Sequence, residues 1–275
     1  MTLSNAQPTG PDDRAGRGFW DGVWKAKRRS RVVGDRRPTF REMRYSALFA
    51  RAFALLGDTR GKRLLEVGCA DSAWMPWFAK QWGFRVSGLD YSAVGCERAE
   101  ALGKASGVEL DIVCGDMFAP PESMLGQFDV VVSMGLVEHF DDTAGAVRAL
   151  SRLLKPGGVL ITTVPNIAGL TGTLMKWVNR DVYDKHVPLD AAALRKAHDD
   201  AGLELVECDY LMAVNLGVVN AAELDPRKLT TKLKQALVFG FIVASRGIWV
   251  LERTIHPLPV RPSTSPYIAA IARVR

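Results

Sequence analysis

A turn rich in small residues is the first part of the sequence whose residue types could do chemistry. Residues 64–72 read Leu-Leu-Glu-Val-Gly-Cys-Ala-Asp-Ser, so a short apolar strand ends in small residues where a helix is expected to begin. Such a turn brings backbone N–H groups and the N-terminus of a helix close to a ligand. We therefore expect a bound cofactor to be contacted by Glu66, Gly68, Cys69 and Ala70.

Two acidic residues follow at the ends of the next two expected strands. Asp90, beside Tyr91, comes about 20 residues after Gly68, where an acidic side chain accepts hydrogen bonds from a ribose diol. Asp116 precedes the apolar Met117, and this pair suits an adenine, with the carboxylate taking the exocyclic amine and Met117 packing on the ring. Because open α/β sheets bind ligands at the carboxyl ends of their strands, these segments predict one nucleoside site.

The elements that must position these residues alternate between strands and helices. This alternation predicts right-handed βαβ units and a mostly parallel sheet covered by helices on both faces. The expected fold class is therefore α/β, a Rossmann-like, doubly wound sheet of seven strands. The strands are expected at 63–67, 85–89, 109–113, 128–132, 159–164, 203–210 and 267–274, and the helices near 73–82, 92–105, 142–154 and 189–201.

Three further stretches complete the expected domain organisation. Residues 1–18 are polar and are interpreted as a disordered basic leader, whereas 19–60 have apolar residues at helical spacing and predict an N-terminal helical cap. The main domain spans 61–275, with a helical insertion at 211–265 where a short turn would suffice. Arg246 interrupts the apolar run of this insertion, so we expect no membrane span, which needs about 20 apolar residues.

Composition and charge bound the class of protein. The hydrophobic share of 48% and the charged share of 24% are those of a soluble globular protein. Four scattered cysteines suit a reducing cytosol, and the N-terminus lacks the apolar run of a signal peptide, so we expect a cytoplasmic protein. The net charge of +6 lies entirely within residues 1–44, which either form a solvated leader or meet an acidic surface, a phosphate or nucleic acid.

Five segments in order give the sequence a specific resemblance. It resembles the class I S-adenosylmethionine methyltransferases, and most of all the branch with ubiquinone-pathway O-methyltransferases and many sugar and natural-product enzymes. The resemblance covers about residues 62–210 and weakly the last strand. It implies S-adenosylmethionine as cofactor, S-adenosylhomocysteine as product and an antiparallel seventh strand. The segments are Glu66-x-Gly68-x-Ala70-x-Ser72, Leu89-Asp90-Tyr-Ser, Gly115-Asp116-Met, Phe128-Asp-Val-Val with Val137-Glu138-His139-Phe, and Leu154-Lys-Pro-Gly-Gly-x-Leu.

The cofactor side of the resemblance adds further candidates. Ser133 and Met134 end the fourth strand, and Trp20, next to Trp24, resembles the aromatic segment that covers the cofactor in relatives. Arg44 is a candidate for the cofactor carboxylate. Ala70 and Ser72 stand where relatives usually carry glycine, and each adds a side chain near the cofactor. An NAD site, or no cofactor, is the weaker interpretation, because Gly68, Ala70 and Ala73 match the NAD glycine pattern poorly.

The acceptor side of the resemblance rests on two histidines. Methyl transfer mainly needs alignment of acceptor, methyl and sulfur, but a hydroxyl acceptor also needs a base. His139, on the loop that closes over the methyl in this family, is the leading candidate, and the alternative is a structural histidine. His186 occupies a place where relatives carry a histidine, and it either faces the acceptor or lies on the surface.

A metal is not expected. Related ubiquinone-pathway enzymes are thought to place a divalent cation on a Glu-x-x-Glu-His run, but Gly135 stands first here and leaves Glu138 and His139. Two ligands make a poor site for a hard cation, although Asp141 or Asp142 could add a third.

The leading hypothesis is therefore O-methylation of a small molecule, a sugar or glycan, or a lipid-linked hydroxyl. The basic and apolar run at 227–251 could touch a membrane surface, pack on the sheet or join a second subunit in a homodimer. The alternatives are an RNA methyltransferase that uses the basic N-terminus, and a non-catalytic cofactor-binding partner. Nucleic acid is disfavoured because the Asn/Asp-Pro-Pro-Tyr/Phe signature of amino-directed enzymes is absent.

Overall fold

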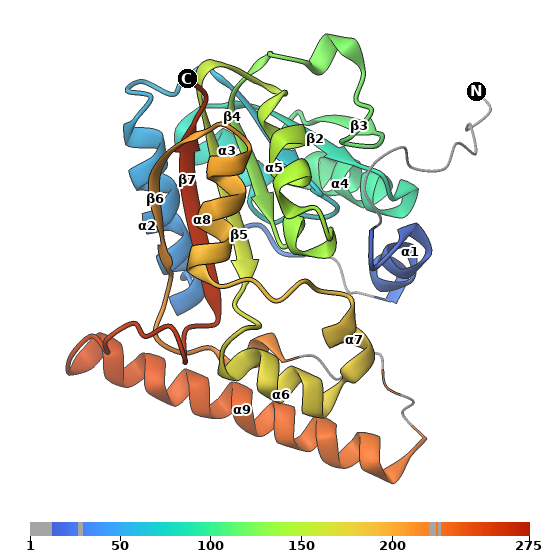
Figure 1. The fold of residues 1–275 in the computed structure, drawn as a ribbon, viewed down its shortest axis with the longest axis vertical. Coiled ribbons are helices and arrows are strands. Elements are labelled where there is room, and N and C mark those ends of the chain that lie inside the picture. The colour runs from blue at the N-terminus through green and yellow to red at the C-terminus, as the bar shows by residue number, and fades with distance from the viewer. Residues whose placement is uncertain (1–12, 27–29, 220–223, 225–226) are drawn as a thin grey trace.

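The protein is built on a single seven-stranded sheet with helices on both faces (Figure 1). The structure is a computed structural model that describes residues 13–26, 30–219, 224 and 227–275. The strand order is β3-β2-β1-β4-β5-β7-β6, and β7 runs antiparallel to both of its neighbours. This arrangement confirms the fold class expected from the sequence. The strands are β1 (Arg63–Val67), β2 (Arg85–Asp90), β3 (Asp111–Cys114), β4 (Phe128–Met134), β5 (Leu154–Pro165), β6 (Glu204–Tyr210) and β7 (Tyr267–Arg273).

The alternation of side chains along the strands divides the apolar core into two halves. Successive residues of a strand point to opposite faces of a sheet. Leu64 accordingly packs in one core cluster and Leu65 in the other, and Val130 and Val131 divide in the same way. Both faces are therefore buried, as the continuous apolar runs of these strands predict.

The helices cover the two faces and the carboxyl ends of the parallel strands. Residues of α2 and α3 contribute to one core cluster, and residues of α5 and α8 contribute to the other. Local capping sets several helix starts, because Thr39 and Glu42 form a capping box on α2 and Ser92 caps α4. The main helices are α1 (Arg17–Ala26), α2 (Phe40–Ala54), α3 (Met75–Trp82), α4 (Ala93–Ser106), α5 (Thr143–Ser151), α6 (Leu170–Val178), α7 (Arg180–Asp184), α8 (Ala191–Asp200) and α9 (Leu229–Thr254), with short 3₁₀ turns η1 (Glu122–Met124), η2 (Val137–His139) and η3 (Leu216–Val218).

The N-terminal region differs from the expected leader and cap. Residues 13–18 form the last part of the expected leader, and the structure holds them against the domain instead of leaving them disordered. A bridge joins Asp13 to Phe140, and the backbone N–H of Arg14 donates to the carbonyl of His139 at 2.9 Å. Residues 1–12 lie outside the described part. The cap is two separate helices, because α2 belongs to a core of the sheet while α1 lies beside α4. A helical period alone does not say what a helix packs against.

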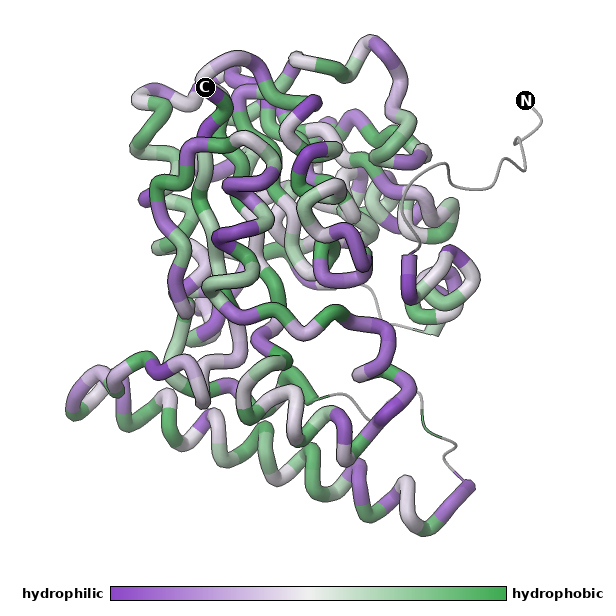
Figure 2. Tube along the Cα trace, in the orientation of Figure 1, coloured by the Kyte–Doolittle hydropathy of each residue, from purple (hydrophilic) through white to green (hydrophobic). Residues whose placement is uncertain are grey.

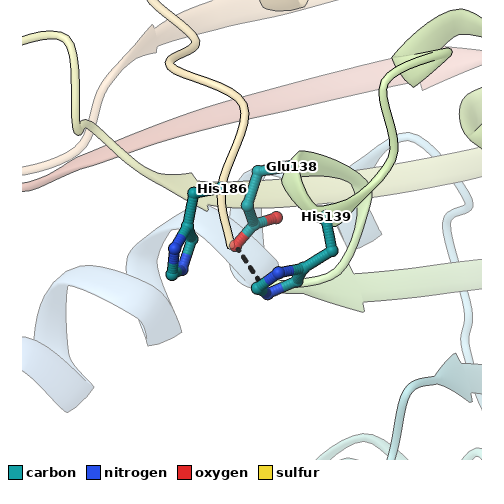
Figure 3. Close-up of side chains that lie close together, drawn as sticks. All are labelled: Glu138, His139 and His186. Carbon is teal, nitrogen blue, oxygen red and sulfur yellow. Dashed lines mark ion pairs between the residues drawn. The ribbon is translucent and has the colours of Figure 1, made fainter. Parts of the chain in front are cut away.

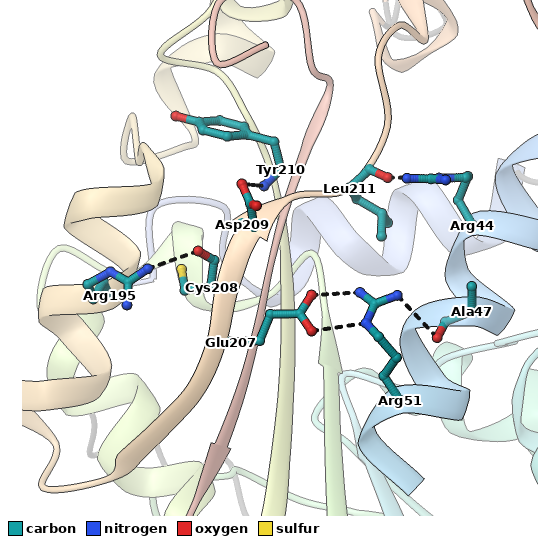
Figure 4. A network of polar contacts seen from close by, with 9 residues as sticks. All are labelled: Arg44, Ala47, Arg51, Arg195, Glu207, Cys208, Asp209, Tyr210 and Leu211. Carbon is teal, nitrogen blue, oxygen red and sulfur yellow. Dashed lines mark hydrogen bonds and ion pairs between the residues drawn. The ribbon is translucent and has the colours of Figure 1, made fainter. Parts of the chain in front are cut away.

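A polar network fixes α2 against the edge strand β6 (Figure 4). The Arg51 guanidinium donates to both carboxylate oxygens of Glu207, at 2.9 and 2.6 Å. Arg44 donates to the backbone carbonyl of Leu211 at 3.0 Å. Arg44 therefore helps to hold α2 next to the end of β6, and its contact with the cofactor carboxylate stays a prediction.

The insertion before the last strand forms one long helix rather than an interrupted one. Helix α9 is continuous through Arg246, and it lies across the end of the sheet, beyond the arrowhead of β5 and next to α6 (Figure 1). A single Arg does not interrupt a helix, because it is a good helix former. Within the described residues, α9 is long and apolar enough to cross a membrane by length and composition, which the sequence prediction denied.

Candidate active site

A hollow lies at the carboxyl ends of β1, β2 and β4, where the sequence predicts a nucleoside site. Its volume is about 620 Å³, which is in the range of small-molecule pockets. The strand ends reach it because β1, β2, β3 and β4 run parallel and end at the same edge. Eight residues expected at the site line this hollow: Trp20, Gly68, Asp90, Tyr91, Asp116, Met117, Met134 and His139.

The first turn has the conformation that a close ligand requires. Gly68 has φ +71° and Ala70 has φ +33°, both in the left-handed region that favours glycine. The backbone N–H of Ala70 donates to Asp90 at 2.9 Å, and the N–H of Ser92 donates to the other carboxylate oxygen at 2.8 Å. Asp90 thus links the first turn to the start of α4, and burial raises its pKa.

Five residues expected at the site do not line the hollow. Ala70 supports the turn, and Cys69 is buried against β2, where a Cβ at Gly88 would lie 2.6 Å from its Sγ. Ser133 is fully buried within β4, and His186 lies behind His139. Glu66 lies beneath the turn, 2% exposed, and one of its carboxylate oxygens has no hydrogen-bond partner among the described residues.

Burial controls the ionisation of Glu66. Removal from water raises the pKa of its carboxyl group to about 8, although a hydrogen bond with Ser72 opposes this shift. Near neutral pH the group is therefore mostly a neutral acid. It supports the turn from below, and it does not contact the hollow in this conformation.

Helix α1 closes the hollow from the outside, and sequence reasoning found only part of this cover. Trp20 lies edge-on to His139, with ring centroids 5.1 Å apart, and stacks on Trp24 at 6.0 Å. The Tyr91 hydroxyl donates to Asp13, and the Arg17 guanidinium lies over the Tyr91 ring at 5.5 Å. The sequence alone carried no pattern that would single out Asp13 or Arg17, since both belong to the expected leader.

The second group of candidate residues is a cluster of the buried Glu138 and His139 with the half-buried His186 (Figure 3). One ligand atom from each lies within 4.8 Å of the others, and the two imidazole centroids are 4.6 Å apart. His139 Nδ1 lies 2.8 Å from the carbonyl of Lys185, and His186 Nδ1 lies 2.7 Å from the carbonyl of Val182. Since a carbonyl oxygen only accepts, each Nδ1–H donates and each Nε2 keeps a free lone pair.

Burial sets the charge of this cluster. Burial and, to a smaller extent, the neighbouring His186 together lower the pKa of His139 to about 4. Burial also raises the pKa of Glu138 to about 8, and one Glu138 carboxylate oxygen has no hydrogen-bond partner among the described residues. Both imidazoles are therefore neutral near pH 7, and a buried carboxyl group lies beside them.

The cluster of Glu138, His139 and His186 offers a metal ion three ligands instead of the two expected from the sequence. The expectation of no metal rested on two ligands, but the fold adds His186 as a third. Asp141 and Asp142 do not take this role, since Asp141 pairs with Arg14 at 2.5 Å and Asp142 caps α5. Two imidazole nitrogens with Nδ1–H anchored on carbonyls, beside an unpaired carboxylate oxygen, fit a divalent transition-metal cation better than magnesium.

A second, smaller hollow of about 250 Å³ adjoins the first. Both hollows share Met134 and Gly135 in their walls. Its polar lining includes Arg41, Tyr45 and Tyr267, and Arg41 forms a hydrogen bond with the Tyr267 side chain.

Comparison with known proteins gives a consistent family. A family model described as a methyltransferase domain matches residues 39–208. Three ubiquinone biosynthesis O-methyltransferases are similar in sequence. The protein of Escherichia coli O157:H7 is 30% identical over 201 residues, which covers 72% of this chain and 76% of the relative. The protein of Thiobacillus denitrificans is 31% identical over 61% of this chain and 77% of the relative. That of Erwinia tasmaniensis is 34% identical, over 38% of this chain and 43% of the relative.

Solved structures share the fold at low sequence identity. A putative sarcosine dimethylglycine methyltransferase from Galdieria sulphuraria is 16% identical, with a TM-score of 0.62 over 95% of this chain and 98% of that chain. A geranyl diphosphate C-methyltransferase from Streptomyces coelicolor, solved with Mg²⁺ and S-adenosylhomocysteine, is 14% identical, with a TM-score of 0.57 over 98% of this chain and all of that chain. At these identities the likeness supports the fold alone.

Proposed function

The chain belongs to the class I S-adenosylmethionine-dependent methyltransferases, and from that premise we propose that it methylates a hydroxyl group of a small molecule, with His139 as the base. S-adenosylmethionine is the methyl donor and S-adenosylhomocysteine the product. The relatives named for ubiquinone biosynthesis support oxygen as the acceptor atom and a small molecule as the acceptor class.

The observation that carries the proposal is the position of His139. Its imidazole lines the larger hollow, and its Nδ1–H is held by the Lys185 carbonyl, so Nε2 is the basic atom. The imidazole is neutral near pH 7, so Nε2 can accept a proton from a bound hydroxyl as the methyl transfers, although its lowered pKa makes it a weaker base than a solvated histidine. The adjoining hollow, with Arg41 and two tyrosines, offers polar groups that suit a polar acceptor rather than an extended nucleic acid.

The roles of the cofactor side chains follow from the same geometry. We infer that Asp90 accepts hydrogen bonds from the ribose, that Asp116 and Met117 hold the adenine, and that α1 excludes water once the cofactor is bound. The wall of the hollow also includes Gly68, Tyr91, Met134 and Trp20. Glu66, Cys69, Ala70 and Ser133 hold the strand ends and the turn in place.

The Glu138, His139 and His186 cluster supports a second way to activate the acceptor. A divalent cation held by these three side chains would lower the pKa of a hydroxyl group bound to it. The unpartnered Glu138 oxygen is the observation that favours this arrangement. In either case His139 lies at the point where the acceptor loses its proton.

Basic residues near the N-terminus do not favour the RNA alternative. Arg14, Arg36 and Arg44 contact Asp141, Glu42 and the Leu211 carbonyl within the protein. Lys27, Arg28 and Arg29 lie outside the described residues. We also propose a cytoplasmic location, which the small-molecule function and the scattered cysteines support.

The test is a comparison of two histidine variants with the same acceptor panel of phenols, sugars and tRNA. His139→Ala is expected to bind S-adenosylmethionine within about threefold of wild type and to lose about 10²–10⁴-fold in turnover. His256→Ala, a change at an exposed histidine remote from the hollow, is the control and should keep full turnover. Near-wild-type turnover of His139→Ala would remove His139 from the mechanism, and methylation of tRNA alone would replace the small-molecule proposal.

A further inference from the structure

The outward face of α9 carries a row of large apolar side chains. Six of them are at least half exposed: Leu229 at 71%, Leu233 at 63%, Phe239 at 66%, Val243 at 50%, Val250 at 60% and Leu251 at 53%. Hydrophobic residues recur along the middle of α9, while hydrophilic ones gather towards its ends (Figure 2). At 1.5 Å per residue the helix is about 39 Å long, and these exposed apolar residues follow one side of it from its first turn to its last. Stripes of this kind mark interaction surfaces on soluble proteins.

The inward face of the same helix is attached to the domain at several points along its length. The Lys234 ammonium donates to the carbonyl of Val178 at 2.7 Å, and the Ser245 hydroxyl accepts from the N–H of Leu216 at 2.9 Å. Further along, the Trp249 indole donates to the carbonyl of Val214 at 2.8 Å and stacks on Phe40. A helix held lengthwise in this way cannot stand across a bilayer while the domain stays folded as described. It can lie along a surface.

The charges around the stripe are almost all positive. Residues 227–261 contain seven Lys or Arg and one acid, Glu252, whose carboxylate accepts a hydrogen bond from the N–H of Leu258. Lys228 and Lys232 lie at the first turn of α9, Arg246 follows Val243 on the exposed side, and Arg253 lies near the end. A second copy of this chain would bring the same positive charges against each other, with no exposed acid from α9 to pair with them. An anionic surface would match them.

We propose that α9 is an in-plane membrane helix that docks the protein on an anionic lipid bilayer. Phe239, Val243, Val250 and their neighbours enter the boundary between head groups and acyl chains, while the flanking Lys and Arg side chains reach lipid phosphates. Each basic side chain near an anionic leaflet adds electrostatic attraction, so the charges and the apolar stripe act together.

Docking in this orientation has a structural consequence for the rest of the protein. Helix α9 lies beyond the carboxyl end of β5, at the edge of the sheet where the parallel strands end (Figure 1). Its Trp249 stacks on Phe40, the first residue of α2, and Arg41 and Tyr45 of α2 line the smaller hollow. The bilayer would therefore lie on the same side of the molecule as the two hollows. The docking itself is independent of which acceptor is methylated.

The experiment measures binding of the full chain to lipid vesicles by flotation. Vesicles of phosphatidylcholine with phosphatidylglycerol are compared with vesicles of phosphatidylcholine alone, at low and at high salt. We expect at least tenfold stronger binding to the anionic vesicles, and loss of most of this preference at high salt. Absence of binding to anionic vesicles at low salt would overturn the proposal, as would equal binding to both vesicle types.

Two sets of variants assign the binding to α9. A triple variant that combines Phe239→Ser, Val243→Ser and Val250→Ser should bind anionic vesicles at least tenfold more weakly. The control Val206→Ser, at an exposed valine of β6, should leave vesicle binding unchanged. Lys228→Gln, Lys232→Gln and Arg253→Gln together should remove the anionic preference, whereas Lys80→Gln with Lys104→Gln should retain it. Circular dichroism and thermal unfolding check that each variant is folded.

Two other outcomes would overturn the proposal by identifying another occupant. The first is a concentration-dependent dimer in sedimentation equilibrium that the triple serine variant dissolves, because the stripe would then be a subunit interface. The second is retention in vesicles after alkaline carbonate extraction, because α9 would then cross the bilayer.

Discussion

Replacement of Glu66 by glutamine tests how the turn beneath the cofactor hollow is stabilised. Glu66 is 2% exposed, and one of its oxygens has no hydrogen-bond partner among the described residues. Burial raises the pKa of its carboxyl group from 4.5 to about 8. Glutamine has nearly the same shape and never ionises, so Glu66→Gln removes the titration without removing the side chain.

The sign of the effect follows from proton binding in the two states. Below pH 4.5 the carboxyl is protonated in both the folded and the unfolded chain, and the pKa shift has no effect. Between pH 4.5 and about 8 the unfolded chain loses the proton while the folded one keeps it, so wild-type stability falls as the pH rises. Above pH 8 the loss is complete, with an upper bound of about 5 kcal/mol. The stability of Glu66→Gln relative to wild type should therefore rise between pH 5 and pH 8.

Thermal and urea unfolding of the cofactor-free protein at pH 5, 6, 7 and 8 measures this difference. Even a third of the upper bound would raise the unfolding midpoint of the variant relative to wild type by about 3–6 °C. Glu109→Gln, at an exposed glutamate, is the control and should track wild type at every pH. A relative stability that stays constant with pH, or falls towards pH 8, would refute the reasoning, because Glu66 would then be ionised and favourably paired in the folded protein.

Three further predictions concern the two sides of the site. Trp20→Ala should weaken S-adenosylmethionine binding about tenfold in calorimetry, because Trp20 covers the hollow and packs on His139; unchanged affinity would show that α1 does not close over the cofactor. Ala70→Gly should raise the free energy of unfolding by up to about 1 kcal/mol, since Ala70 has φ +33°; a loss of stability in urea would contradict the strain. EDTA-stripped protein should bind Mn²⁺ at one site in calorimetry, and Glu138→Gln should weaken this binding at least tenfold; equal affinities would place the cation elsewhere.

The sequence by itself determined the sheet and the edge of the sheet at which the cofactor hollow lies. Strand and helix periods are local properties, and the small residues of the turn, Asp90 and Asp116 all lie at or just after the end of a strand. Once the strands are parallel and adjacent, their carboxyl ends meet at one edge, so Gly68, Asp90 and Asp116 share a hollow. Short-range pattern and the regular geometry of parallel βαβ units were sufficient for this part.

Only the tertiary structure decided which distant segments meet at the site. Asp13 and Arg17 read as part of a disordered leader, yet they reach Tyr91. His186 comes from α7's C-terminal side, in a stretch whose helices the sequence did not predict, and it completes the cluster with Glu138 and His139. Such contacts depend on how loops pack after the sheet has formed, and no local period encodes them.

The same distinction explains α9. Its apolar residues and basic flanks are visible in the sequence, but an apolar residue on a helix either packs inward or faces out. The packing of Ser245 and Trp249 on the domain fixes the rotation of the helix and thereby leaves Phe239, Val243 and Val250 exposed. The sequence determined that α9 is amphiphilic, and the tertiary structure decided which of its residues face the solvent, because rotation about a helix axis is set by contacts with the rest of the fold.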